Sequence, residues 1–149
     1  MSGSPNKVGP AAALLKEHVP KAGDRAAGRY RVLVVDDHAM VRQRLRILLE
    51  SYSELLVIGE ATNGLDAISM ANAIRPDIII MDVNMPRMSG IVATKHIKNA
   101  QPTTIVIGLS VNDSGQIGGA MRAAGADAFL LKDAASDKLY GLIAELTHR

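Results

Sequence analysis

Three carboxylates, a hydroxyl and an ammonium group stand at the ends of short apolar runs in this sequence. Asp36 and Asp37 follow the first such run, and Asp82 follows the third. Ser110 and Lys132 follow the last two. Any one aspartate in such a place is more simply explained as the cap of a following helix. The repeated pattern instead indicates one polar site that is assembled from the ends of several strands.

The chemistry of such a site follows from its charges. At about 4 Å and an effective dielectric near 20, each contact between two carboxylates costs about 4 kcal/mol, so we expect a cation among them. Oxygen ligands suit a hard ion, which makes Mg²⁺ the expected cofactor, with Mn²⁺ as the alternative. Lys132 and Ser110 can donate hydrogen bonds to phosphate oxygens. An aspartate that attacks phosphorus forms an acyl phosphate, so the residues predict phosphoryl transfer to a carboxylate.

The elements that would position these residues alternate along the chain. Short runs rich in β-branched residues predict buried strands at residues 32–35, 55–59, 78–81, 105–109 and 128–131. Between and after them, apolar residues at helical spacing predict helices around residues 40–49, 65–74, 91–97 and 139–146. A further helix, the fourth in chain order, is expected at residues 114–124, where each of three glycines costs about 1 kcal/mol relative to alanine.

This alternation predicts an α/β fold of the (βα)5 type. Strands this apolar must be covered on both faces, which indicates a doubly wound parallel sheet of five strands. Right-handed crossovers favour the flavodoxin-like strand order 2-1-3-4-5. In such sheets ligands bind beyond the carboxyl ends of the strands, where the five polar residues stand.

Composition separates the chain into two parts. Residues 1–28 mix Gly, Pro, Ser, Ala and charge and are interpreted as a flexible leader, with only residues 11–18 able to form two helical turns; residues 29–149 are interpreted as the folded domain. Residues 1–29 carry a net charge of +3 and the remaining 120 residues −1, so no nucleic-acid surface is expected on the folded part. The sequence has no cysteine and no apolar run of membrane-spanning length, so we expect a cytoplasmic protein.

Four motifs in order resemble the receiver domains of two-component response regulators. They are VVDDH at residues 34–38, MDVNMPRMSG at 81–90, GLS at 108–110 and AGADAFLLKD at 124–133. The resemblance covers about residues 31–146. The DDH run, GEATNG at residues 59–64 and LLKD at 130–133 are most similar to receivers of the LuxR-type (NarL/FixJ-like) subclass.

The resemblance implies a role for each matching residue. Asp82 is the expected phosphoacceptor, and Asp36 and Asp37 are the acid pair that holds Mg²⁺ together with Asp82. The backbone carbonyl of Asn84 is a further expected metal ligand. Ser110 matches the switch hydroxyl and Lys132 the phosphate-binding lysine, and Phe129 matches the switch aromatic. On phosphorylation, the face made by the fourth helix, fifth strand and fifth helix is expected to change shape.

Three residues raise separate questions. Asp133 stands where most receivers have proline after the lysine, which leaves the geometry of that peptide bond open. Phe129 replaces the tyrosine that is more usual in the subclass. His38 invites a metal or phosphotransfer interpretation, but a first-turn helix residue at the rim of the site is the simpler one. The glycines of the fourth helix suggest a helix that is mobile before phosphorylation.

The resemblance also implies partners and excludes some activities. A sensor histidine kinase or a phosphotransfer protein is the expected donor, and an output domain or a partner protein the expected receiver of the signal. We expect no turnover of a separate substrate, since the domain assists only its own phosphorylation and dephosphorylation. An aspartyl-phosphate phosphatase would need an acid at position 84, which is Asn84. The alternative is a non-phosphorylated pseudo-receiver for docking or dimerisation.

Three arrangements of the whole protein stay open from the sequence. The chain is a stand-alone receiver, a piece of a longer regulator or the receiver of a hybrid kinase. Receivers of this type form homodimers through helical faces, so self-association is a further expectation.

Overall fold

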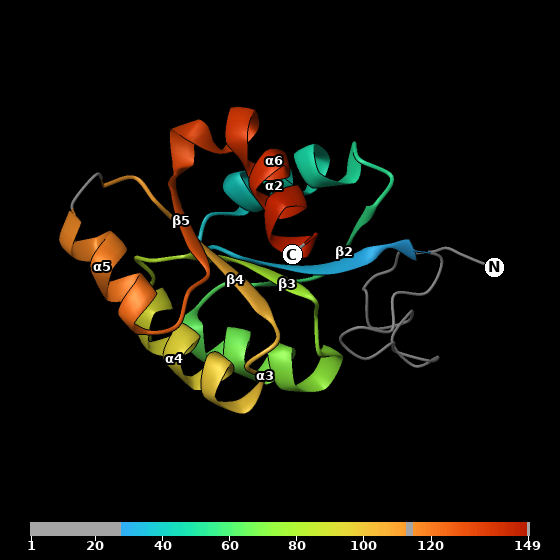
Figure 1. Cartoon of the computed structure of the whole chain (residues 1–149). Helices are drawn as coiled ribbons and strands as arrows, with labels where there is room; N and C mark the ends of the chain where they lie inside the picture. Colours follow the sequence, from blue (N-terminus) through green and yellow to red (C-terminus); the bar gives the residue numbers. More distant parts are fainter. Residues whose placement is uncertain (1–27, 113–114, 149) are drawn as a thin grey trace.

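Short runs rich in Val, Ile and Leu form one five-stranded sheet in the part of the chain that the structure describes, residues 28–112 and 115–148 of a computed structural model (Figure 1). The strands are β1 (Tyr30–Val35), β2 (Leu55–Ala61), β3 (Ile78–Asp82), β4 (Ile105–Ser110) and β5 (Ala128–Leu131). Neighbouring strands are parallel and lie in the order β2-β1-β3-β4-β5. The predicted fold class and strand order are confirmed.

Helices cover both faces of this sheet. They are α2 (Ala39–Glu50), α3 (Gly64–Ile74), α4 (Gly90–Ala100), α5 (Gly115–Ala123) and α6 (Ala135–Thr147), with the 3-10 turn η2 (Lys132–Ala134) before α6. Figure 1 shows α2 and α6 on one side of the sheet and α3, α4 and α5 on the other. The helices pack on two separate apolar cores, one for each face.

The central strand β1 illustrates why both faces are apolar. Val32 and Val34 belong to the core under α2 and α6, whereas Leu33 and Val35 belong to the core under α3, α4 and α5. All four are at most 1% exposed. Because successive side chains of a strand point to opposite faces, a strand between two helical layers must be apolar throughout. Such a strand ends where polar side chains are tolerated, at the edge of the sheet.

The loop after β3 fixes the start of α4 against the sheet. The N–H of Gly90 donates to the carbonyl of Val83 at 2.8 Å. A Cβ at Gly90 would lie 2.0 Å from the backbone oxygen of Asp82, so only glycine fits there. Ser89 caps α4 by accepting a hydrogen bond from the Val92 N–H. The backbone around Asp82 is therefore held by close packing as well as by the strand.

The boundaries of the elements differ in detail from the prediction. β3 and β4 include Asp82 and Ser110 as their last residues, because these residues still pair with Leu109 and Leu131 of the neighbouring strands. The helix predicted at residues 114–124 forms as α5 despite its glycines. One reason is visible in the packing: a Cβ at Gly118 would lie 3.4 Å from the ring of Phe129, so the bare backbone receives that ring.

Three other expectations concern residues 11–18, the peptide bond after Lys132 and membrane-spanning helices. The expected helical turns at residues 11–18 lie outside the described residues, as does Ser114. The peptide bond between Lys132 and Asp133 is trans, as are the other described peptide bonds. Among the described residues, no helix combines the length and the apolar character needed to cross a bilayer.

Candidate phosphoacceptor site

The carboxyl end of β1 brings a fully buried carboxylate to the edge of the sheet. Asp36 is 0% exposed, and its backbone N–H donates to the carbonyl of Ala61 in β2 at 3.1 Å. Its Oδ1 accepts a hydrogen bond from the backbone N–H of His38 at 2.9 Å. Its Oδ2 accepts one from Nζ of Lys132 at 2.7 Å. A charge buried this completely needs such partners, and the site provides them.

Asp82 ends the neighbouring strand β3 and is also buried, with 3% exposure. Its Oδ1 lies 3.2 Å from Nζ of Lys132 and accepts a long hydrogen bond, 3.4 Å, from the backbone N–H of Asn84. Its Oδ2 has no hydrogen-bond partner among the described residues. An unpaired buried carboxylate oxygen costs free energy unless something else binds it. This oxygen is therefore the one available to a ligand.

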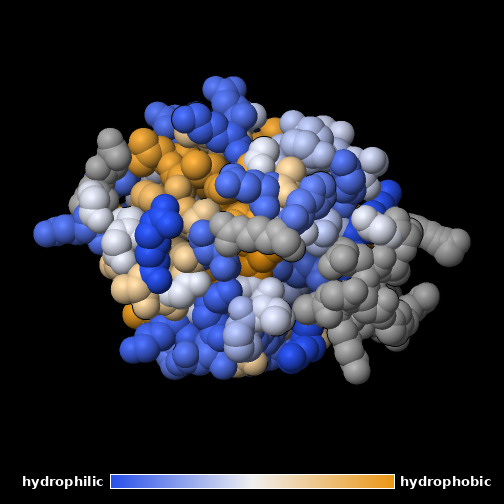
Figure 2. Space-filling model, viewed as in Figure 1, coloured by the Kyte–Doolittle hydropathy of each residue, from blue (hydrophilic) through white to orange (hydrophobic). Residues whose placement is uncertain are grey.

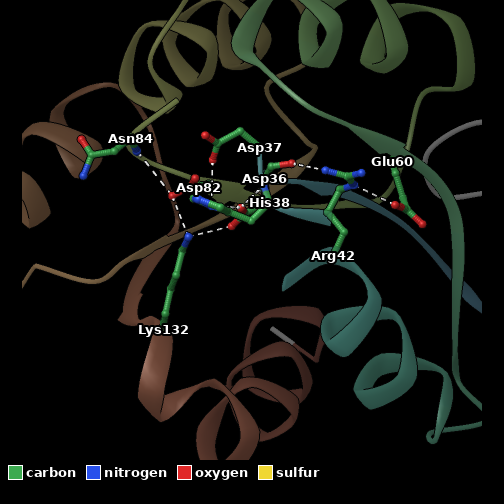
Figure 3. Close-up of polar contacts among 8 residues, drawn as sticks. All are labelled: Asp36, Asp37, His38, Arg42, Glu60, Asp82, Asn84 and Lys132. Atoms are coloured by element: carbon green, nitrogen blue, oxygen red, sulfur yellow. Dashed lines mark hydrogen bonds and ion pairs between the residues drawn. The ribbon is translucent and has the colours of Figure 1, made fainter. Parts of the chain in front are cut away.

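Lys132 connects the two aspartates although it lies in a distant part of the sequence. Its ammonium group bridges Asp36 at 2.7 Å and Asp82 at 3.2 Å, and Figure 3 shows it reaching both carboxylates from η2. The ammonium group of Lys132 thus holds the carboxylates of Asp36 and Asp82 at the same edge of the sheet. The predicted convergence of Asp36, Asp82 and Lys132 is confirmed as geometry, while their chemical roles stay predictions.

Burial and charge shift the acidity of both partners. Burial, together with the charge of Asp36, raises the pKa of Asp82 from its ordinary 3.8 to about 6, against the opposing effect of Lys132. For Lys132, burial lowers the pKa, but the hydrogen bond to Asp36 and the charges of Asp82 and Asp36 outweigh it and raise the pKa. Near pH 7 Asp82 is thus mostly ionised and Lys132 is protonated.

The second acid of the pair is less enclosed. The side chain of Asp37 is 26% exposed, and its Oδ1 is a buried atom without a hydrogen-bond partner among the described residues. Nδ1 of His38 lies 3.2 Å from this oxygen and 3.3 Å from Oδ1 of Asp36, while the imidazole itself is 68% exposed. Ligand atoms of Asp36, Asp37 and His38 all lie within 4.8 Å of one another.

These donors suit a hard divalent cation. Within the described part of the chain, Oδ2 of Asp82 and Oδ1 of Asp37 accept no hydrogen bond, although the latter lies near the imidazole of His38. Carboxylate oxygens are the ligands that Mg²⁺ uses in proteins, usually one or two together with water and phosphate oxygens. The residues present therefore fit a magnesium ion, and His38 lies at the rim of the group as the simpler interpretation expected.

The remaining predicted residues occupy nearby positions. Asn84 is exposed, and its backbone N–H is the group that points toward Asp82, whereas Figure 3 shows its side chain directed away. Ser110 is fully buried, and its Oγ accepts a hydrogen bond from the backbone N–H of Asn112 at 3.0 Å. Phe129 is half-buried against the core under α3, α4 and α5. Ser110 and Phe129 thus lie on adjacent strands, β4 and β5.

Sequence reasoning missed two residues that contact this site from the side. Arg42 of α2 donates from Nη1 to the backbone carbonyl of Asp36 at 2.8 Å and from Nε to Oε1 of Glu60 at 2.8 Å. Arg42 follows Asp37 by five residues, and Glu60 lies in the GEATNG run near the end of β2. The signal in the sequence was a basic residue on the first helix and an acid near the end of the adjacent strand.

A comparison with protein families decides what this arrangement is. The family model described as response regulator receiver domain matches residues 32–144. The chain belongs to the response regulator receiver domain family. This family is a signalling family rather than a catalytic one.

Individual relatives agree with this assignment. The receiver is 42% identical over 110 residues to the transcriptional regulatory protein YdfI of Bacillus subtilis, covering 74% of this chain and 51% of that protein. It is 38% identical over 115 residues to the uncharacterized transcriptional regulatory protein YxjL of the same organism, covering 77% of this chain and 53% of that protein. The chain thus spans about half the length of these curated relatives.

Solved structures similar to this chain include receivers of the LuxR/NarL subclass. The signal receiver domain of the putative response regulator NarL from Mycobacterium tuberculosis matches with a TM-score of 0.75 and 29% identity, over 81% of this chain and 98% of that one. A LuxR-family two-component response regulator from Aurantimonas sp. matches with a TM-score of 0.76 and 28% identity, over 81% and 87%. The response regulator domain of Thermotoga maritima CheB matches with a TM-score of 0.75 and 31% identity, over 81% and 98%. The predicted likeness to LuxR/NarL-type receivers is confirmed.

Proposed function

We propose that Asp82 accepts a phosphoryl group from a phosphohistidine of a sensor histidine kinase or a phosphotransfer protein. The observation that carries this proposal is the pair of contacts made by Lys132, which holds Asp36 and Asp82 together while Oδ2 of Asp82 stays buried and unpaired among the described residues. In the transfer, a bond forms between a carboxylate oxygen of Asp82 and phosphorus. The bond between phosphorus and the donor imidazole breaks, and that nitrogen keeps the electron pair and takes up a proton from water.

The charge state of the site supports this role. With a pKa of about 6, Asp82 is mostly ionised at pH 7, which is the nucleophilic form. Lys132 remains protonated and can turn from Oδ1 of Asp82 toward a phosphoryl oxygen without leaving Asp36. The proposed role of Lys132 is therefore to neutralise charge on the transferred group.

A divalent cation, Mg²⁺ or Mn²⁺, belongs to the same proposal. Asp36, Asp37 and Asp82 would hold it, with the backbone carbonyl of Asn84 as a fourth protein ligand. When bound, the ion supplies positive charge to the phosphoryl oxygens. The support for this assignment is the set of unpaired carboxylate oxygens at the end of the sheet.

The response to phosphorylation is proposed to pass through Ser110 and Phe129. An acyl phosphate adds roughly −1.5 to −2 charges and three acceptor oxygens. Ser110 would exchange its hydrogen bond with Asn112 for one to the phosphoryl group, and Phe129 would move into the space that the hydroxyl leaves. The surface that changes is the one formed by α5, β5 and α6. Hydrophobic side chains gather there over β5 in Figure 2, and three of the four β5 residues are only half-buried.

The biological setting is a further part of the proposal. Residues 29–149 are the receiver and residues 1–28 a linker or leader. The α5-β5-α6 surface acts on an output domain or on a partner protein, and copies of the chain can pair through their helical faces. The protein works in the cytoplasm without binding nucleic acid directly through this domain, and it assists only its own phosphorylation and dephosphorylation.

The test is the intact mass of the protein after incubation with acetyl phosphate and Mg²⁺. The wild type is expected to gain one phosphoryl group, and Asp82→Asn and a chelator-treated sample are expected to gain none. If the wild type binds Mg²⁺ but is not modified, the experiment is repeated with a phosphorylated histidine kinase. If it neither binds Mg²⁺ nor is modified by either donor, the domain is a pseudo-receiver that acts by docking.

A further inference from the structure

Arg42 bridges the backbone of the acid pair and a carboxylate of the second strand, β2. Arg42 lies one turn into α2, and its side chain is 15% exposed. Its guanidinium donates from Nη1 to the carbonyl oxygen of Asp36 and from Nε to Oε1 of Glu60, both at 2.8 Å. Figure 3 shows the guanidinium between these two acceptors. The planar fork of an arginine fixes the directions of both hydrogen bonds, whereas the single nitrogen of a lysine does not.

Glu60 is in turn fixed by a second arginine. Arg46, one helical turn after Arg42, donates from Nε and Nη2 to Oε2 of Glu60 at 3.0 and 2.9 Å. Burial raises the pKa of Glu60, but the hydrogen bonds from the two arginines outweigh it and lower the pKa below its ordinary value. Both oxygens of Glu60 are therefore occupied, and the carboxylate is a stationary anchor for Arg42.

The contact with Asp36 concerns the backbone that carries the acid pair. The N–H of Asp36 is held by the carbonyl of Ala61, and its carbonyl is held by Arg42. This carbonyl belongs to the peptide unit that joins Asp36 to Asp37, so its direction sets where the Asp37 side chain begins. Oδ1 of Asp37 has no hydrogen-bond partner in the described part of the chain. Its side-chain contact, at 3.2 Å, is with the largely exposed imidazole of the adjacent His38, so the place of Asp37 depends mainly on the backbone.

We propose that Arg42, anchored by Glu60, is a positioning residue that holds the Asp36–Asp37 peptide in the orientation needed to bind a divalent cation. This inference deepens the proposed function and rests on it. Groups that orient metal ligands typically contribute 10- to 100-fold to metal affinity. The competing explanation is an ion pair that stabilises the packing of α2 on β2 and does nothing at the site.

The chain offers a matched control for that alternative. Arg46 binds the same carboxylate of Glu60 from the same helix, but its ion pairs among the described residues are with Glu50 and Glu60 rather than with the acid pair. Arg42→Met removes the contact with the Asp36 carbonyl together with one arm of the Glu60 pair. Arg46→Met removes the other hydrogen-bonding partner of Glu60 together with the more exposed pair between Arg46 and Glu50 at 3.6 Å. A purely structural role predicts similar effects of the two substitutions, whereas a positioning role predicts a difference at the metal site alone.

The experiment is calorimetric titration of the full chain with Mg²⁺, accompanied by urea unfolding of each variant without metal. Arg42→Met is expected to weaken Mg²⁺ binding 10- to 100-fold and Arg46→Met less than twofold, with comparable losses of stability. Arg42→Lys keeps the positive charge but not the planar guanidinium, and its Mg²⁺ affinity is expected to lie between those of Arg42→Met and Arg46→Met. It replaces Arg42→Met in the experiment if that variant does not fold.

Equal Mg²⁺ affinities for the wild type and both arginine variants would overturn the inference and leave the proposed function intact. Equal weakening by Arg42→Met and Arg46→Met would overturn it as well, since the effect would then belong to Glu60 and the helix. A wild type that does not bind Mg²⁺ would overturn the proposed function together with the inference.

Discussion

The raised pKa of Asp82 makes a quantitative prediction about stability without metal. An aspartate whose pKa rises from 3.8 to about 6 on folding disfavours the folded state once it ionises. At 1.36 kcal/mol per pH unit the penalty is at most about 3 kcal/mol, so we expect about 1–3 kcal/mol. Asp82→Asn removes the ionisation while it keeps the shape of the side chain. At pH 7.5 the metal-free variant should therefore be more stable than the wild type by about 1–3 kcal/mol.

The direction of this pH dependence follows from the number of protons bound at Asp82 in the folded and unfolded states. Between pH 3.8 and 6 the folded state binds more protons at Asp82 than the unfolded state, so the contribution of Asp82 to the stability of the wild type falls as the pH rises through that window. Below about pH 3 the aspartate is protonated in both states, so the advantage of Asp82→Asn should be small at pH 4 and absent below pH 3. Above about pH 7 the advantage should reach a plateau.

The assay is urea unfolding of both proteins in chelator at several pH values from 4 to 8, with the slope of the transition checked for constancy. Asp127→Asn is a control, because Asp127 pairs with Lys98 at 3.0 Å away from the site and no comparable gain is expected. A stability difference between Asp82→Asn and the wild type that does not change from pH 4 to pH 8 would refute the reasoning. The carboxylate would then not be strained by its surroundings.

Three further predictions concern neighbouring residues. Lys132→Met should raise the pKa of Asp82 above about 6, because the lysine is the group that opposes burial, and NMR titration of the side-chain carboxyl measures it; an unchanged pKa would contradict the geometry. Gly90→Ala should destabilise the fold by about 3 kcal/mol, because its Cβ would overlap the Asp82 carbonyl; urea unfolding with normal stability would show that the loop moves freely. Gly119→Ala, with open space around the new Cβ, should stabilise the domain by up to about 1 kcal/mol through helix propensity and increase amide-exchange protection in α5; unchanged protection would remove the expectation that glycine makes this helix mobile.

The sequence predicts the sheet well because its strands are buried on both faces. A strand such as β3, whose five residues are all buried, is apolar without interruption up to its terminal Asp82, so its position is readable from composition alone. The exact ends were not readable in this way. Asp82 and Ser110 belong to their strands because Leu109 and Leu131 pair with them, which is a property of the neighbouring strands.

The site was only partly predictable for a related reason. The strand order places Asp36, Asp82 and Lys132 together once the fold is known, because parallel strands bring their carboxyl ends to one edge. The direction of the Ser110 hydroxyl toward Asn112 depends on a side-chain rotamer, about which composition carries no information. Arg42 was missed because its two acceptors, a backbone carbonyl of β1 and a carboxylate of β2, become neighbours only when α2 packs on the sheet.

The charges at the site support the proposal that one cation and one phosphoryl group bind there together. Asp36, Asp37 and Asp82 against Lys132 leave a net charge of −2 when all are ionised, which a divalent cation cancels. Phosphorylation replaces the single charge of Asp82 with roughly −1.5 to −2 and would bring a metal-free site to about −3. With a divalent cation bound the same site stays near −1. Removal of the metal should therefore oppose the gain of the phosphoryl group more strongly than it changes the fold, and the bridging Lys132 alone is too little positive charge to replace it.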